Sequence, residues 1–189
     1  MQGESVCEGV GKLCMIASDS KSSNQATLIG YMAFVDLDGH GFVGGYLIVN
    51  EQARPVEFHC TAPVMTNRTQ EILYGQVFRP AVLCDQIGGA LLKQVSKPPV
   101  MIFTDDRDAL GIRGLAKVPV AFVHDDQVEQ SSVDTSFEVD GVVLEIGGSH
   151  PGDRTQIQQH LQELSPSWDV AEPLDRIRAA ITEAQRVAA

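Results

Sequence analysis

The stretch "LIGYMAFVDLDGHGFVGGYLIVNEQARPVEFHCT", residues 28–61, decides the fold. It contains three apolar, strand-like segments, at 28–37, 42–50 and 54–61. Gly39 and Gly41 favour a turn between the first two segments, and the polar triplet 51–53 favours a second turn. The stretch therefore predicts three consecutive antiparallel strands. The pair Gly44-Gly45 indicates a bulge or a close backbone approach within the second strand.

The third segment alternates between apolar and polar residues, with Phe58 and Cys60 on one face and Glu57 and His59 on the other. Neighbouring residues of a strand point to opposite sides of the sheet. His59 and Cys60 are adjacent in sequence, but they cannot form a catalytic dyad with each other. We expect Cys60 to be a core residue.

Helix signals follow the three strands. Asn67 and Gln70 have the spacing of a capping box, and Gly75 favours the end of that helix. Pro80 suits the first turn of a second helix, in which apolar residues from Val82 to Val95 repeat at helical spacing.

The remaining chain predicts a mixed sheet. The runs 100–104 and 118–124 are almost wholly apolar, as central strands covered on both faces tend to be. Asp140-Gly141 favours a type I′ hairpin. Two amphipathic helices end the chain, and Asp153 and Gln156 have the spacing of a capping box for the first of them. The order β-β-β-α-α-β-(α)-β-β-β-α-α predicts an α/β fold of the α+β type. We expect a single mixed, mostly antiparallel sheet with helices packed on it.

The domain organisation follows from composition. Residues 1–27 are rich in Ser, Gly and Asn, which predicts a flexible leader before a single globular α/β domain at 28–189. No apolar run is long enough for a membrane helix, and the N-terminal residues lack the pattern of a signal peptide. The four cysteines form no C-x-x-C pair, and reduced thiols fit a cytoplasmic, acidic protein.

Charge guides the expectation about partners. Residues 1–125 carry 10 basic and 13 acidic residues, net −3, and residues 126–189 carry 4 and 12, net −8. Nucleic acids and anionic membranes are bound through clustered cations. We therefore expect neither a nucleic-acid nor a membrane partner, and leave a protein partner or self-association open.

Three segments are candidates for chemistry. The acidic run 104–108 follows a strand, but its carboxylates are adjacent rather than convergent, so we expect no metal there. The turn at 145–154, with Ser149 and His150, leads into a helix N-terminus that favours an anion, although no Walker or dinucleotide motif is present. On the polar face of the 54–61 strand, Arg54, Glu57 and His59 are candidate ligand-binding residues. We expect no cofactor and identify no catalytic residue.

The segment "GGYLIVNEQARPVEFHCTAPV…NRTQEILYG" resembles a family of uncharacterised, hypothetical bacterial proteins over roughly residues 30–95. That resemblance implies no activity. Because no catalytic motif is present, the sequence favours a non-enzymatic binding or regulatory module. The alternative is a small enzyme or small-ligand-binding protein that uses the polar face of 54–61 or the anion site at 145–154. Whether the chain is an enzyme is left open.

Overall fold

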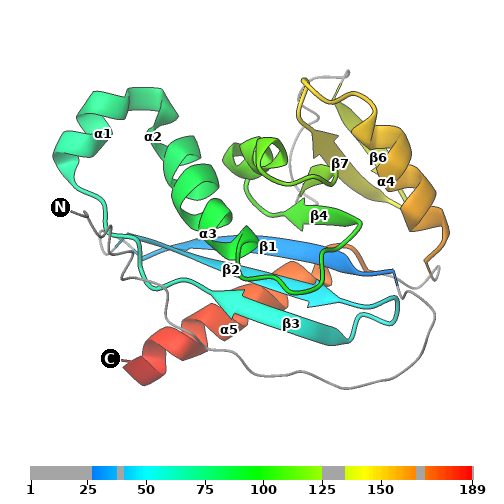
Figure 1. Ribbon diagram of the computed structural model, residues 1–189, viewed down its shortest axis with the longest axis horizontal. Helices are drawn as coiled ribbons and strands as arrows, with labels where there is room; N and C mark the ends of the chain where they lie inside the picture. The colour runs from blue at the N-terminus through cyan, green and yellow to red at the C-terminus, as the bar shows by residue number, and fades with distance from the viewer. Residues whose placement is uncertain (1–26, 38–40, 125–134, 165–168, 189) are drawn as a thin grey trace, which may run out of the picture.

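The computed structural model describes residues 27–37, 41–124, 135–164 and 169–188 (Figure 1). The predicted leader at 1–27 therefore lies, apart from Thr27, outside the described residues. No helix within the described ranges is both long and apolar enough to cross a membrane.

Seven strands form one mixed sheet in the order β3-β2-β1-β4-β5-β7-β6. They are β1 (Ile29–Asp36), β2 (Phe42–Val49), β3 (Pro55–Cys60), β4 (Met101–Thr104), β5 (Val120–Val123), β6 (Ser136–Val139) and β7 (Val142–Ile146). β1, β4 and β5 are parallel, and the other neighbouring pairs are antiparallel. The predicted mixed, mostly antiparallel sheet and the predicted order of elements are confirmed.

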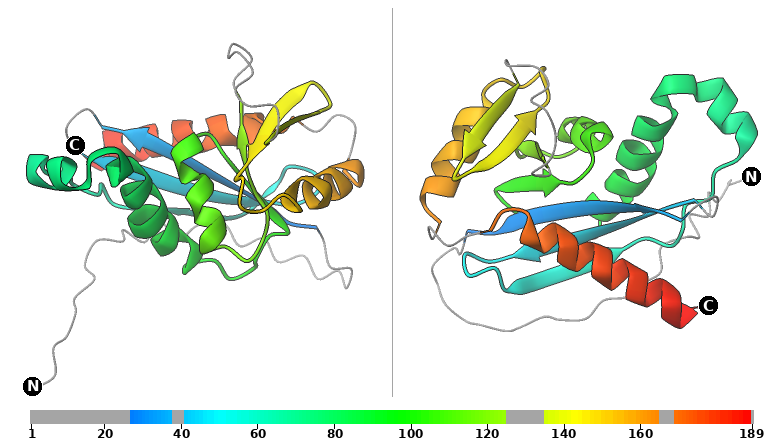
Figure 2. Two further views of the ribbon diagram at one scale, coloured as in Figure 1. Left: turned by 90° about the horizontal axis from the view of Figure 1, so that it is seen from above. Right: turned by 180° about the vertical axis from the view of Figure 1, so that it is seen from behind.

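Helices cover both faces of this sheet (Figures 1 and 2). One core cluster joins the sheet to α4 (Asp153–Gln162) and α5 (Glu172–Ala188). The other joins it to the helical segment 78–92 and to the 3-10 helix η3 (Arg107–Gly114). That segment consists of α2 (Phe78–Pro80), the π-helical η2 (Ala81–Gly88) and α3 (Gly89–Leu92). The period-2 alternation of strand side chains divides the apolar residues between these two cores.

Gly44 and Gly45 allow helices to approach β2 closely from opposite sides. A Cβ at Gly44 would lie 2.2 Å from Ile87 of η2, and a Cβ at Gly45 would lie 2.4 Å from Ile177 of α5. The irregularity of β2 against β3 lies instead at Ile48/Val49. The sequence predicted either a bulge or a close backbone approach at this glycine pair, and the structure shows the close approach.

The first helix, α1 (Arg68–Tyr74), begins and ends where the sequence predicts. Asn67 and Gln70 form the reciprocal capping box, and Gly75 ends the helix. α1 has no buried residue and projects from the body of the molecule with the short 3-10 turn η1 (Gly75–Val77) (Figure 1). It is held by its cap and by its connections rather than by a core of its own.

The β6–β7 hairpin has positive φ at both Asp140 (50°) and Gly141 (84°), as the predicted type I′ turn requires. The expected cap of α4 is not formed, because Gly152 precedes the helix and Asp153 is its first residue. The Asp153 carboxylate instead accepts two hydrogen bonds from Arg113 of η3, at 2.6 and 3.1 Å. A long-range ion pair thus replaces a local cap.

Candidate active site at the carboxyl edge of the sheet

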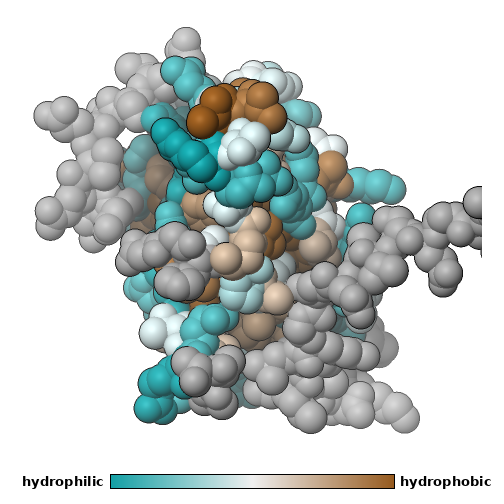
Figure 3. Space-filling view, turned by 90° about the vertical axis from the view of Figure 1, so that its left-hand side faces the viewer, coloured by the Kyte–Doolittle hydropathy of each residue, from teal (hydrophilic) through white to brown (hydrophobic). Residues whose placement is uncertain are grey.

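Charged side chains gather where the three parallel strands end. The carboxyl ends of β1, β4 and β5 meet at one edge of the sheet, the position at which open α/β sheets bind their ligands. We call the group there the carboxyl-edge cluster. It consists of Arg79, Asp105, Asp106, Arg107, His124, Glu145 and Arg178. Figure 3 views the molecule from this end, where hydrophilic and hydrophobic side chains are both exposed.

Asp105 directly follows β4 and lies on the α5 side of the sheet. One carboxylate oxygen accepts a hydrogen bond from the backbone N–H of Phe34 in β1 at 3.3 Å, and the other accepts one from Nε of Arg178 at 2.8 Å. The Asp105 side chain is only 5% exposed. Burial raises the pKa of the Asp105 carboxyl to about 6, against the lowering effect of Arg178.

Asp106 turns to the opposite side, toward the helical segment 78–92. Its carboxylate caps η3 by accepting a hydrogen bond from the Asp108 N–H at 2.9 Å, and it also pairs with Arg79 of α2. Nε of Arg79 lies 3.3 Å from the Asp108 carboxylate. Arg79 therefore fastens α2 to the start of η3.

Glu145 of β7 connects the next pair of elements. It accepts two hydrogen bonds from Arg107, from Nε at 2.9 Å and from Nη2 at 2.6 Å. Nε2 of His124, at the end of β5, lies 3.2 Å from the same carboxylate. Both His124 and Glu145 are buried, and the bidentate geometry fixes the Arg107 guanidinium plane.

The three arginines of the cluster remain accessible. The side chains of Arg79, Arg107 and Arg178 are 42%, 48% and 48% exposed. Each uses part of its donor set on a carboxylate, and a guanidinium has five N–H donors. Arg79 and Arg178 keep donors beyond those that these carboxylates use, and half-exposed guanidinium groups suit oxygen-rich anions such as phosphates.

The carboxylates of the cluster do not form a metal-binding set. Asp105 and Asp106 point to opposite sides of the sheet, and each is engaged by a guanidinium. Within the described ranges, no three His, Cys, Asp or Glu side chains converge as a metal would require. The arrangement offers ionic and acid–base chemistry.

The predicted residues of the 54–61 strand lie away from this cluster, on the edge strand β3. Nε2 of His59 lies 3.3 Å from the Glu57 carboxylate, which also accepts a hydrogen bond from the Ser96 N–H at 3.0 Å. Arg54 is exposed and precedes the strand, where its backbone N–H donates to the Asn50 side chain. Glu57 and His59 thus form a pair, and Arg54 has no hydrogen bond to that pair.

The predicted anion site at 145–154 begins at Glu145, a member of the cluster, and continues beyond the end of β7 into α4. Ser149 is exposed and His150 is half-buried in the turn before α4. The Glu145 and Asp153 carboxylates, at the two ends of this segment, are already paired with Arg107 and Arg113. The structure does not bring Ser149 and His150 together with Arg54, Glu57 and His59.

Sequence reasoning found the acidic run 104–108 but not its partners. Arg178 lies 73 residues from Asp105, and Glu145 lies 38 residues from Arg107. No local motif links such pairs, because they are brought together by strand order and by the packing of α5. The available signal was the position of Asp105 and Asp106 directly after a central apolar strand.

No family model and no curated protein matches this sequence. The solved structures that match this chain include the following two. The structure of human ENDOV has a TM-score of 0.50 at 12% identity, covering 87% of each chain. An Endonuclease V from Ciona intestinalis, solved with a 23mer DNA containing an inosine followed by a ribo-adenosine, has a TM-score of 0.40 at 11% identity. That match covers 70% of this chain and 76% of the other. At these identities the likeness to human ENDOV establishes the fold.

These matches contradict two expectations. The expectation of a non-enzymatic module is wrong, because the fold is one on which an endonuclease is built. The expectation of an uncharacterised, hypothetical type of protein is wrong for the same reason. The exclusion of nucleic acid as a partner is wrong for the same reason. That exclusion rested on net charge, which governs long-range steering. It does not describe the local cluster of half-exposed arginines at the carboxyl edge.

Proposed function

We propose that this chain is a hydrolytic enzyme that acts on the phosphodiester backbone of a nucleic acid at the carboxyl-edge cluster. The observation that carries the proposal is Asp105, a buried carboxyl with a pKa of about 6, held at the ends of the parallel strands beside a half-exposed guanidinium. The likeness of the fold to human ENDOV supports it.

In this mechanism Asp105 is the general base. A carboxylate with a pKa near 6 is deprotonated at neutral pH and is a better proton acceptor than one with an ordinary pKa. It takes a proton from the attacking water as the water oxygen bonds to phosphorus. The phosphorus–oxygen bond to one strand end breaks in the same displacement, and the leaving oxygen takes a proton from solvent. Arg178, whose Nε now donates to Asp105, and the half-exposed Arg79 bind the phosphate oxygens and stabilise the negative charge that develops on them.

The test is cleavage of labelled oligonucleotides by the purified full chain. The panel contains single- and double-stranded DNA and RNA, with and without inosine, each with Mg²⁺, with Mn²⁺ or with a chelator. We expect Asp105→Asn to lower the cleavage rate by about 100-fold or more, because general base catalysis contributes at least that much. The wild-type rate should rise as the pH passes upward through about 6.

The matched control is Asp175→Asn. Asp175 also accepts a hydrogen bond from Arg178, at 2.9 Å, but its side chain is 74% exposed. This variant removes the same charge from the same arginine and should cleave at the wild-type rate. The proposal fails if the wild-type chain cleaves no member of the panel, or if Asp105→Asn and Asp175→Asn behave alike.

We also propose a cytoplasmic location. Among the described residues, Cys60 and Cys84 are both free thiols. Reduced cysteines are the rule in that compartment.

A further inference from the structure

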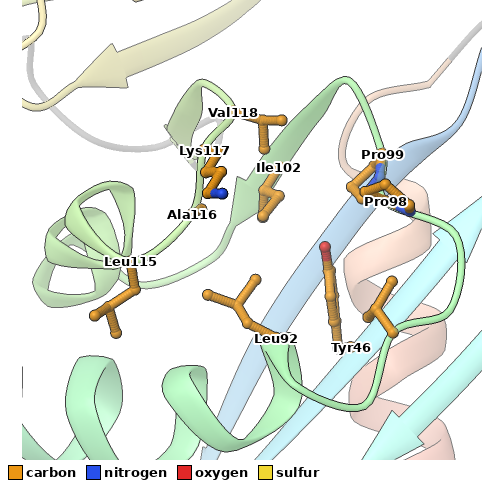
Figure 4. A pocket seen from close by; sticks show the side chains of 10 residues that line it. Tyr46, Leu92, Pro98, Pro99, Ile102, Leu115, Ala116, Lys117 and Val118 are labelled. Carbon is orange, nitrogen blue, oxygen red and sulfur yellow. The ribbon is translucent and has the colours of Figure 1, made fainter.

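A pocket of about 250 Å³ lies on the same side of the sheet as α3. Its walls come from the end of α3, the 98–99 linker, the 115–118 segment, β2 and β4 (Figure 4). They are mainly apolar, and include Leu92, Val95, Ile102 and Val118. Pro98 and Pro99 precede β4, and Val118 precedes β5, so the pocket lies at the amino ends of these strands. It is therefore separate from the carboxyl-edge cluster.

One buried polar atom faces this pocket. Tyr46 of β2 is fully buried, and its hydroxyl has no hydrogen-bond partner among the described residues. Figure 4 shows the hydroxyl at the end of the ring, directed into the space enclosed by the lining side chains. A buried hydroxyl without a partner costs free energy, so its retention requires an explanation.

The local packing holds the Tyr46 hydroxyl in this position. A Cβ at Gly30 of β1 would lie 2.9 Å from the Tyr46 oxygen and 3.0 Å from Pro99, so only glycine leaves the present room. Burial, together with the nearby Glu57 carboxylate, raises the pKa of the Tyr46 hydroxyl far above neutral pH. Tyr46 therefore keeps its proton and can donate it in a hydrogen bond.

One lysine lines this pocket, and two others are next in sequence to lining residues. Within the described ranges the lysines are Lys93, Lys97 and Lys117. Lys117 lines the pocket, while Lys93 follows Leu92 and Lys97 precedes Pro98. None of the three has an ion-pair partner in the described part of the chain. Lys117 therefore offers an unpaired ammonium group to a negatively charged ligand, and its attraction opposes the repulsion from the Glu57 carboxylate near Tyr46.

We propose that the pocket binds a small organic acid, with its apolar body against Leu92, Val95 and Ile102 and its carboxylate accepting a hydrogen bond from Tyr46. Lys117 supplies the balancing positive charge. The volume suits a ligand of about ten non-hydrogen atoms, since an apolar cavity of about 150 Å³ accommodates benzene. This site is independent of the proposed nuclease activity and holds or fails without it.

Octanoate is the probe, and 1-octanol is its neutral counterpart. We expect saturable octanoate binding to the full chain by calorimetry. Tyr46→Phe should weaken that binding about tenfold or more, because a hydrogen bond to a charged group is lost. The ligand-free variant should melt at the wild-type temperature or above it, since the substitution removes only an unpartnered hydroxyl.

Two further variants separate charge from shape. Lys117→Gln should weaken octanoate binding about threefold and leave 1-octanol binding unchanged. The matched control Arg68→Gln, on the projecting helix α1, should change neither. Leu92→Phe, which fills the pocket, should abolish binding of both probes.

The proposal is overturned if octanoate shows no saturable binding up to its solubility limit. It is also overturned if Tyr46→Phe and Leu92→Phe bind octanoate as tightly as wild type. A clear loss of melting temperature in ligand-free Tyr46→Phe would mean that the hydroxyl is already satisfied in solution, which would remove the premise.

Discussion

At the scale of single residues, Asp105 is the side chain whose environment most changes its chemistry. Its pKa is about 6 in the folded chain against an ordinary value of 3.8. Between these values the folded state holds a proton that the unfolded state releases. The contribution of Asp105 to stability is therefore fully present below about pH 4 and is lost as the pH rises through about 6.

Replacing Asp105 with Asn should remove this pH dependence. From the two pKa values, Asp105 lowers the free energy of unfolding by about 2 kcal/mol between about pH 4.5 and 7.5. Over the same pH interval, the free energy of unfolding of Asp105→Asn should fall by about 2 kcal/mol less than that of wild type. Urea unfolding at both pH values measures the two falls. Asp175→Asn should keep the wild-type dependence. Equal pH dependence in wild type and Asp105→Asn would show that Arg178 outweighs burial and keeps the carboxylate ionised.

Residue-level reasoning from sequence succeeded where geometry is local. Period-2 alternation predicts that Cys60 and His59 face opposite ways, and their partners in β2 are Gly45 and Tyr46. Cys60, expected in the core, is only half-buried. Asp153 was expected to cap its own helix but pairs with Arg113, 40 residues away. The sequence carries no local mark of such a partner.

At the scale of elements, the adjacent residues Gly88 and Gly89 have opposite roles. A Cβ at Gly88 would lie 2.8 Å from Ile112, whereas a Cβ at Gly89 meets nothing closer than 3.6 Å. Gly88→Ala should destabilise the protein by about 1–3 kcal/mol through overpacking against η3. Gly89→Ala should stabilise it by up to about 1 kcal/mol through helix propensity.

Chemical denaturation of the two alanine variants checks this pair, because they differ only in the neighbour of the new methyl group. The sequence alone treats both glycines as equal weak points of one helix. If both substitutions stabilise, η3 yields to the added methyl and its packing on the helix at 78–92 is looser than the distances indicate.

The elements that the sequence predicted best are those fixed by neighbouring residues. The capping box of α1 and the positive φ values at Asp140-Gly141 are both local. The segment 81–88 was expected as regular α-helix and is π-helical. Its geometry is set against β2 and η3, because Ile87 packs over Gly44 and Gly88 packs against Ile112. Such tertiary demands override the local helical pattern.

At the scale of the whole molecule, fold class was predictable and the composition of the site was not. Apolar runs and turn signals were sufficient to predict a mixed sheet covered by helices. The placement of β4 and β5 beside β1 determines which side chains meet at the carboxyl edge, and that strand order is a global property. Net charge led to the wrong expectation about nucleic acid, because it averages over a chain whose exposed arginines are concentrated at one place.

The two helical layers should be energetically separate, and Gly44 and Gly45 test this. Their new methyl groups would meet Ile87 on one side of the sheet and Ile177 on the other. Each substitution to alanine should cost about 1–3 kcal/mol. Although the residues are adjacent, the double variant should lose the sum of the two single losses to within about 0.5 kcal/mol, the limit for independent sites. A double-mutant cycle of unfolding free energies measures the coupling.

A coupling well above that limit would mean that β2 shifts as a unit. A helical layer that displaces β2 would then also change the packing of the other layer. The sheet would in this way link the pocket side of the molecule to the α5 side, which holds Asp105 and Arg178.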